Sequence, residues 1–347
     1  MSPMAWRVLL AAAAVSFSLA FAPMQAGATD WTVGLRQIEF VDPKDQRLLW
    51  MAVFYPAAPP AAGTPTFPFP YVANVTLYPA APVAPDAGKR PLIMLSHGRG
   101  SDAWQYAWFA QALAAKGYVV AAMNHYRANT YDRDIGYLAN RIWQRPVDLS
   151  TAITFLLADP LWRAHIDADR IGVAGHSQGG FTSLWIGGAR VDADKFLAFQ
   201  RLFINNPRIP EHIRRGLPLD AAPALEVRDW RVKGVFAMAP GIVQAFGMSP
   251  EGLRQLAVPA FLTVGAGDTQ TPPKENAVFA AEHIPDAKLW VIPGPVGHEI
   301  FTNECDQEGK DEFPGSCIDE AGVDRRALHG EIAAAALKFF GTALGVR

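Results

Sequence analysis

A serine on a glycine-rich turn is the first candidate for chemistry in this chain. The stretch "IGVAGHSQGGFTSLW" (171–185) contains a Gly-His-Ser-Gln-Gly pentapeptide centred on Ser177, which matches the G-x-S-x-G pattern found between a strand and a helix. Larger residues at the two outer glycines would clash in this strained turn, and the N-terminus of the following helix favours negative charge near the serine. We predict that Ser177 is a nucleophile and His176 only its neighbour. The alternative is a purely structural turn.

A serine hydroxyl needs a base to be nucleophilic near neutral pH. The chain has eight histidines, and His298 differs from the others in its position. It lies in "VIPGPVGHEIF" (291–301), a loop rich in glycine and proline after the last predicted strand. Because such a loop extends past the carboxyl end of the strand, it can reach over the sheet to Ser177. We predict that His298 is the base; the alternative is a loop histidine that is hydrogen-bonded for structural reasons.

The acid that orients this histidine should follow the preceding strand. In "FLTVGAGDTQTPP" (261–273), Asp268 comes directly after an apolar run and before a predicted helix. We predict that its carboxylate holds the imidazole tautomer of His298 and stabilises the imidazolium. The alternative is a helix-capping aspartate, although Thr269 and Thr271 are also able to cap that helix.

The fourth part of such a site is a pair of donors for a developing oxyanion. The stretch "LSHGRGSDAW" (95–104) places glycines directly after the first core strand, where a backbone N–H can approach a substrate oxygen. We predict that the donors are the backbone N–H groups of Gln178 and Arg99, each worth roughly 3 kcal/mol in the transition state. The side chain of Arg99 either faces solvent or meets an anionic part of a substrate.

Three aromatic residues follow this loop: Trp104, Tyr106 and Trp108. Their helical spacing is typical of a core-facing stripe. We nevertheless expect one of the three to line the site.

These residues require a framework that brings strand ends together. From residue 91 onward, apolar runs alternate with helical stretches, which predicts a mainly parallel sheet with helices on both faces. Ligands on such sheets bind at the carboxyl ends of the strands. Before this region, residues 31–42 and 47–56 are two apolar runs separated by turn residues, and they predict an antiparallel hairpin.

Two segments interrupt this alternation. Residues 56–91 are rich in proline, which excludes a helix or a central strand and favours an extended surface loop. Residues from about 188 to 232 contain no clear strand and are rich in charge, proline and bulky apolar residues. We interpret this second segment as a mostly helical excursion over the active end of the sheet; the alternative is a surface connection that does not contact ligand.

The motifs together resemble the α/β-hydrolase family. The stretches concerned are "PLIMLSHGRGSDAWQYAWFAQALAAKGYVVAAMNH", "VAGHSQGG", "GAGDTQTPP" and "GPVGHEIF". The order Ser177, Asp268, His298 is the one known in that family. The "VFYP" strand and the run from "SHGRG" to "GYVVAA" resemble dienelactone-hydrolase-like proteins and platelet-activating-factor acetylhydrolases. The resemblance covers about Leu49 to the C-terminus, less the excursion.

Two departures limit what this resemblance implies. Dienelactone hydrolases have a cysteine nucleophile, where this chain has Ser177. The acetylhydrolases place their acid after an earlier strand, where this chain has "AMAPGI" (237–242) and no carboxylate. Neither named substrate is therefore carried over to this chain.

The N-terminus and the cysteines bear on where the protein works. Residues 1–28 combine one arginine, an apolar run and a closing Ala-Gly-Ala, which is typical of a cleaved signal peptide; the alternative is an uncleaved anchor. The remaining 29–347 would be one α/β-hydrolase domain. In an exported protein, the only two cysteines, Cys305 and Cys317, predict a disulfide, and free thiols are the alternative.

Composition narrows the classes of partner. The formal net charge is -2 and there is no basic block, so nucleic acid is not an expected partner. We expect no metal and no organic cofactor, and no membrane span after signal cleavage. The sequence thus predicts an exported, periplasmic or extracellular, serine hydrolase acting on small or lipid-like carboxylic esters. Thioesterase, peptidase or polyester-cleaving activity and a non-catalytic secreted binding protein remain alternatives, and the oligomeric state is open.

Overall fold

A mixed sheet forms the centre of the structure, a computed structural model that describes residues 30–85, 88–134, 136–216 and 226–346. The signal peptide predicted for residues 1–28 lies outside the described residues. Within them the sheet has nine strands in the order β3-β1-β2-β5-β4-β6-β7-β8-β9. The strands are β1 (Thr32–Val41), β2 (Leu48–Ala57), β3 (Tyr78–Pro79), β4 (Arg90–Ser96), β5 (Val119–Asn124), β6 (Ile166–His176), β7 (Val232–Met238), β8 (Ala260–Gly265) and β9 (Ala287–Ile292).

The strands from β5 to β9 in this order are all parallel, as predicted. The antiparallel hairpin is confirmed as well, since β1 pairs with β2 and β2 continues the sheet antiparallel to β5. Strand β5 is buried along its whole length, in agreement with its run of small and apolar residues from Val119 to Met123. In β4, Leu92 and Met94 enter one hydrophobic core, while Ile93 and Leu95 enter the other. The two faces of the sheet therefore have separate cores.

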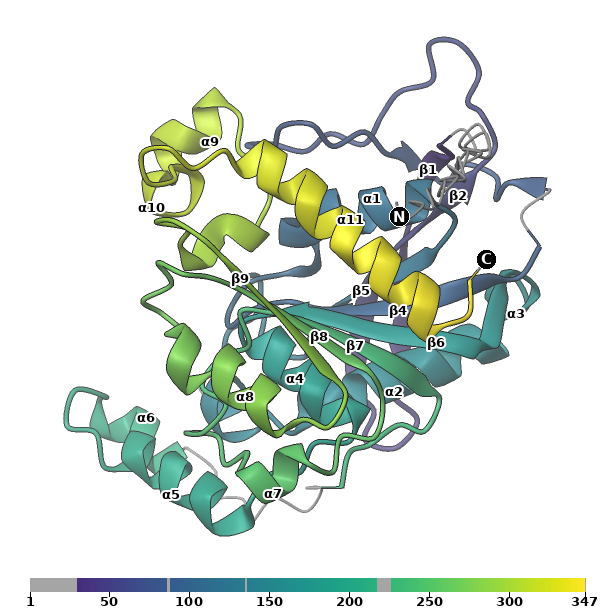
Figure 1. Ribbon diagram of the computed structural model, residues 1–347. Helices are drawn as coiled ribbons and strands as arrows, with labels where there is room; N and C mark the ends of the chain where they lie inside the picture. The colour runs from purple at the N-terminus through teal and green to yellow at the C-terminus, as the bar shows by residue number, and fades with distance from the viewer. Residues whose placement is uncertain (1–29, 86–87, 135, 217–225, 347) are drawn as a thin grey trace, which may run out of the picture. The chain divides into compact units, whose positions relative to one another are not determined.

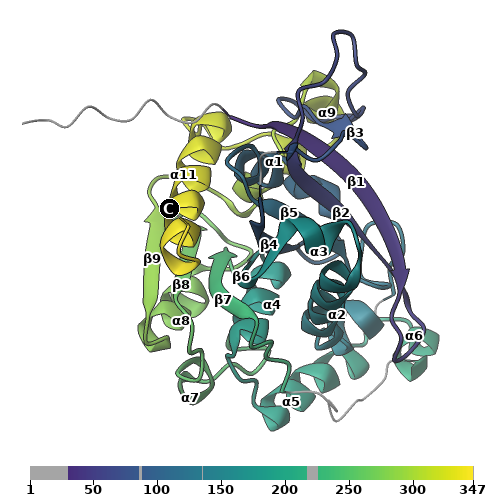
Figure 2. The ribbon, with the colours of Figure 1, turned by 90° about the vertical axis from the view of Figure 1, so that its right-hand side faces the viewer.

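Helices cover both faces of the sheet (Figure 1, Figure 2). Helices α1 (Ala107–Ala115) and α11 (Arg325–Ala343) pack on one face, and both contribute buried residues to the core that contains Ile93. On the other face, α2 (Gln144–Ala158), α4 (Gln178–Gly187) and α8 (Ala277–His283) build the core that contains Leu92.

Shorter elements connect these layers. Among the described residues they include α3 (Trp162–His165), α5 (Ala193–Ile204), α6 (Glu211–Gly216), α7 (Pro250–Leu253), α9 (Gln307–Glu312), α10 (Pro314–Cys317), the 3₁₀ helices Ala103–Tyr106, Pro273–Glu275 and His298–Phe301, and the π-helical turn Gly136–Asn140. In the part of the chain that the structure describes, no helix is both long and apolar enough to cross a membrane.

The segments that interrupt the alternation have the predicted character. In the excursion, α5 and α6 lie side by side at the lower edge of Figure 1. Between β2 and β4, the described residues of the proline-rich segment are mainly extended or in turns, and β3 joins the sheet there beside β1. The predicted disulfide is present between Cys305 and Cys317.

Candidate active site

Ser177 occupies a strained turn between β6 and α4. Its backbone has φ 55° and ψ -119°, a region that non-glycine residues rarely adopt. The two outer glycines of the pentapeptide are required by close contacts: a Cβ on Gly175 would lie 2.3 Å from the carbonyl oxygen of Gly179, and a Cβ on Gly179 would lie 1.9 Å from that of Ser96. The turn therefore presses against the end of β4.

The neighbouring strand β7 holds this turn from the other side. The backbone N–H of Ser177 donates to the carbonyl of Met238 at 2.9 Å, and the N–H of Gly241 donates to the carbonyl of Ser177 at 2.8 Å. A strained residue persists only where its surroundings fix it, and these two hydrogen bonds do so.

Asp268 and His298 are joined by a short hydrogen bond. The Nδ1–H of His298 donates to Oδ2 of Asp268 at 2.7 Å, which assigns the tautomer that leaves Nε2 as an acceptor. Asp268 is 3% exposed and His298 6%. Burial alone would raise the pKa of Asp268, but His298 and the N–H and hydroxyl of Thr271 together hold that pKa below its ordinary value. The carboxylate is therefore ionised when it meets the imidazole.

Ser177 and His298 line one cavity of about 190 Å³. Gln178 and Arg99 also line it. The same cavity therefore brings together residues that follow three different strands in the sequence. Apolar residues form much of the remaining wall: Leu138, Phe199, Ile242 and Phe246. The arrangement fits a reacting group with polar chemistry on one side and an apolar substituent on the other.

The glycine-rich loop after β4 lies against the turn that carries Ser177. A Cβ on Gly98 would be 3.5 Å from the Cβ of Ser177. Among the described residues, the backbone N–H groups of Gln178 and Arg99 donate no hydrogen bond to another protein group. Free donors beside a candidate nucleophile suit an oxyanion site, and this role stays a prediction. The Arg99 side chain is exposed at the cavity.

The comparisons with known proteins agree with this architecture. Residues 72–132 match the family described as platelet-activating factor acetylhydrolase, isoform II. A comparison with curated proteins gives no match. A solved structure, a ferulic acid esterase from Streptomyces cinnamoneus, superposes on this chain with a TM-score of 0.62 at 22% identity, over 93% of each chain. The chain has the α/β-hydrolase fold. The family match also confirms the predicted resemblance to the acetylhydrolases, over a segment that contains the glycine-rich loop.

Within this α/β-hydrolase fold, the prediction for the aromatic residues is wrong. Trp104, Tyr106 and Trp108 do not line the cavity at Ser177. Trp104 stacks on Phe67 of the proline-rich segment with ring centroids 5.3 Å apart, and Trp108 is buried against α11. These rings pack against neighbouring elements, so their surface is not available to the cavity.

Tyr106 nevertheless reaches the site through its hydroxyl. Its oxygen accepts the N–H of Gly98 at 3.0 Å and lies 2.9 Å from Nδ1 of His176. Burial and the neighbouring His298 lower the pKa of His176 well below its ordinary value, so His176 is neutral. Through Tyr106 it connects the turn at Ser177 with the glycine-rich loop at Gly98. The contact itself was missed because 70 residues separate the two partners.

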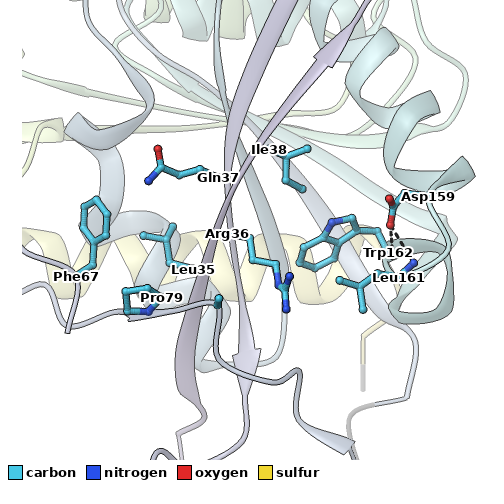
Figure 3. Close-up of a pocket in the computed structure, with 10 residues that line it drawn as sticks. Leu35, Arg36, Gln37, Ile38, Phe67, Pro79, Asp159, Leu161 and Trp162 are labelled. Carbon is cyan, nitrogen blue, oxygen red and sulfur yellow. Dashed lines mark hydrogen bonds between the residues drawn. The ribbon is translucent and has the colours of Figure 1, made fainter. Parts of the chain in front are cut away.

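A larger cavity, of about 410 Å³, lies along β1 and carries no comparable chemistry (Figure 3). Its charged lining residues are Arg36 and Asp159. The Asp159 carboxylate accepts the N–H groups of Leu161 at 2.9 Å and Trp162 at 3.1 Å, so it is used in the turn that precedes α3. Metal-ligand clusters of three or more His, Cys, Asp or Glu side chains are not found among the described residues.

Proposed function

We propose that this α/β-hydrolase is a serine ester hydrolase with Ser177, His298 and Asp268 as its catalytic triad. The observation that carries the proposal is the Asp268–His298 hydrogen bond beside a strained serine on the same cavity wall. The matched family and the superposed structure are both named for ester-cleaving proteins, which supports the same reaction class.

In this proposal each group has one task. Nε2 of His298 takes the proton of the Ser177 hydroxyl while Oγ attacks the ester carbonyl carbon, and Asp268 stabilises the imidazolium. The N–H groups of Gln178 and Arg99 bind the resulting oxyanion. When the tetrahedral intermediate collapses, the C–O bond to the alcohol breaks and His298 returns its proton to that alcohol. Water then attacks the acyl-enzyme with His298 as base, which releases the acid and restores Ser177.

The cavity favours an ester with a small apolar group near the carbonyl. Its volume is about 190 Å³, and two of its walls are the phenyl rings of Phe199 and Phe246. A thioester, peptide or polyester would use the same triad, and the shape of the pocket decides between them. Export, which the disulfide favours, is part of the proposal.

A labelling experiment tests the nucleophile. The wild-type protein should hydrolyse p-nitrophenyl acetate and butyrate and should form a fluorophosphonate adduct on Ser177, whereas Ser177→Ala should do neither. A tryptic map that places the adduct on another residue would contradict the assignment. Peptide and thioester substrates in the same assay separate the alternatives, since an esterase should prefer the oxygen esters.

A further inference from the structure

Arg145 is a fully buried cation directly behind the candidate oxyanion site. It lies in the first turn of α2 and is 2% exposed. Its Nη1 donates to Oε1 of Gln178 at 2.6 Å, and its Nη2 donates to the backbone carbonyl of His97. Nη2 also lies 3.4 Å from the hydroxyl oxygen of Ser96.

These contacts go to the two segments that carry the proposed oxyanion donors. The His97 carbonyl belongs to the peptide next to the one that supplies the Arg99 N–H. Gln178 supplies the other N–H, and its side-chain amide is held at both ends, since Nε2 donates to the Leu138 carbonyl at 2.9 Å. One guanidinium therefore fixes the end of β4 relative to the start of α4. A planar group with several donors suits this task, because it can bind two acceptors at once in a fixed geometry.

The charge of Arg145 is not neutralised by a carboxylate in direct contact. Its hydrogen-bond partners among the described residues are neutral: an amide oxygen, a carbonyl and a hydroxyl. The nearby carboxylate of Asp148 is bonded instead to Arg47 and, at 3.0 Å, to Nδ1 of His125. Burial lowers the pKa of Arg145 to about 9, which still leaves it charged at neutral pH. Burying a cation with neutral partners has a large desolvation cost, and a purely structural brace does not need the charge.

We propose that Arg145 is a positioning residue for the oxyanion site, which aligns the Arg99 and Gln178 N–H groups and places a positive charge behind the oxyanion. The inference rests on the proposed ester hydrolysis. It predicts stabilisation of the tetrahedral intermediate and little effect on substrate binding, because the charge on the substrate oxygen develops only after attack.

The test compares three variants of the full chain. Arg145→Met removes the charge and the hydrogen bonds, and Arg145→Lys keeps the charge but cannot bridge both acceptors. Arg47→Met is the matched control: it removes another buried guanidinium, 6% exposed, which is bound to carboxylates and touches neither oxyanion segment. For each variant we would measure the kinetics with p-nitrophenyl butyrate, the melting temperature, and the inhibition by an alkyl trifluoromethyl ketone. That inhibitor forms a tetrahedral oxyanion on the serine.

We expect Arg145→Met to lower kcat about 100-fold with KM within about threefold of wild type, and Arg145→Lys to lower kcat about 10-fold. The affinity for the trifluoromethyl ketone should fall in parallel with kcat/KM. Arg47→Met should melt at a lower temperature and keep kcat within about threefold. A merely structural Arg145 would change the melting temperature and the yield of folded enzyme, but not kcat per folded, titratable site.

The outcomes separate this inference from the proposed function. A folded Arg145→Met with wild-type kcat and inhibitor affinity overturns the inference alone; if that variant does not fold, wild-type kcat in Arg145→Lys does so. A wild type that neither hydrolyses esters nor reacts with a fluorophosphonate overturns the proposed function, and the inference falls with it.

Discussion

At the scale of single residues, Asp268 closes a turn and also binds the imidazole of the proposed base, but it does not cap the following helix, whose N-cap is Pro272. Its Oδ1 accepts the N–H groups of Gln270 at 2.9 Å and Thr271 at 2.8 Å, which closes the turn after β8. Its Oδ2 accepts Nδ1–H of His298 and the hydroxyl of Thr271. The turn hydrogen bonds fix the carboxylate in the position from which it accepts the His298 N–H, so this structural role is compatible with the proposed catalytic one.

Replacing this carboxylate by an amide should therefore damage activity more than folding. We expect Asp268→Asn to lower kcat about 10⁴-fold, since an amide neither enforces the productive tautomer nor stabilises the imidazolium. Its oxygen can still accept the two turn N–H groups, so the unfolding free energy should change far less. Thr271→Val is the matched control: it removes one hydrogen bond to Oδ2, and we expect less than about a 10-fold loss of kcat. If both variants lost kcat to a comparable extent, the larger catalytic role assigned to the Asp268 carboxylate would be contradicted.

At the scale of elements, the strand ends were predictable and the contacts between distant elements were not. Apolar runs that stop at a glycine-rich turn mark where Ser177 and Asp268 lie, and a parallel sheet brings such ends to one edge. The burial of Arg145 has no comparable signal, because an arginine in the first turn of a helix usually faces solvent. It depends on how α2 packs behind β4 and α4, which no local pattern encodes.

The excursion also makes a contact that the sequence pattern did not predict. Its helical character was predicted, but the residue that reaches the site, Phe199 on α5, was not. Phe199 lies against Phe246 with ring centroids 4.4 Å apart, and both rings line the cavity with Ser177. The excursion thus contributes a wall of the candidate acyl pocket.

Truncating the Phe199 side chain should enlarge the cavity and change the preferred acyl length. We expect Phe199→Ala to raise kcat/KM for p-nitrophenyl octanoate relative to the acetate by about 10-fold or more, because a phenyl ring is removed from a small cavity. Leu202→Ala, three positions further along α5 and 68% exposed, is the control and should leave that ratio unchanged. An unchanged ratio in Phe199→Ala would show that the acyl group lies elsewhere.

The disulfide-closed loop is a second element with a testable role. Cys305 and Cys317 are 12 residues apart, and Cys305 also forms a β-bridge with Val72 of the proline-rich segment. We expect the double variant Cys305→Ser/Cys317→Ser to lose roughly 3 kcal/mol of unfolding free energy, since the unfolded chain is no longer cross-linked. Urea unfolding measures this loss. A reducing agent should destabilise the wild type but not the double variant; an equal effect on both would exclude the disulfide as the cause.

At the scale of the whole molecule, buried histidines link stability to pH. His97, His125, His176 and His329 are all buried, and burial is the main reason that the pKa of each is lowered. In the unfolded chain these groups take up protons near their ordinary pKa of about 6.5. A folded state that does not bind those protons loses stability relative to the unfolded state as the pH falls. The fold should therefore be most stable at neutral or alkaline pH.

His329 allows this linkage to be measured away from the site. Its ring stacks on Trp108 with centroids 3.6 Å apart, and its Nε2–H donates to the Ile300 carbonyl at 2.8 Å. Burial lowers its pKa to about 4, so its contribution is complete above pH 6.5 and is lost as the pH falls toward 4. Between pH 7.5 and 4.5, the unfolding free energy of wild type should fall by roughly 2–3 kcal/mol more than that of His329→Gln, which has no titrating ring. The other buried histidines are common to both proteins, so the difference in urea unfolding isolates His329, and equal falls would mean that His329 is protonated in the folded state as readily as in the unfolded chain.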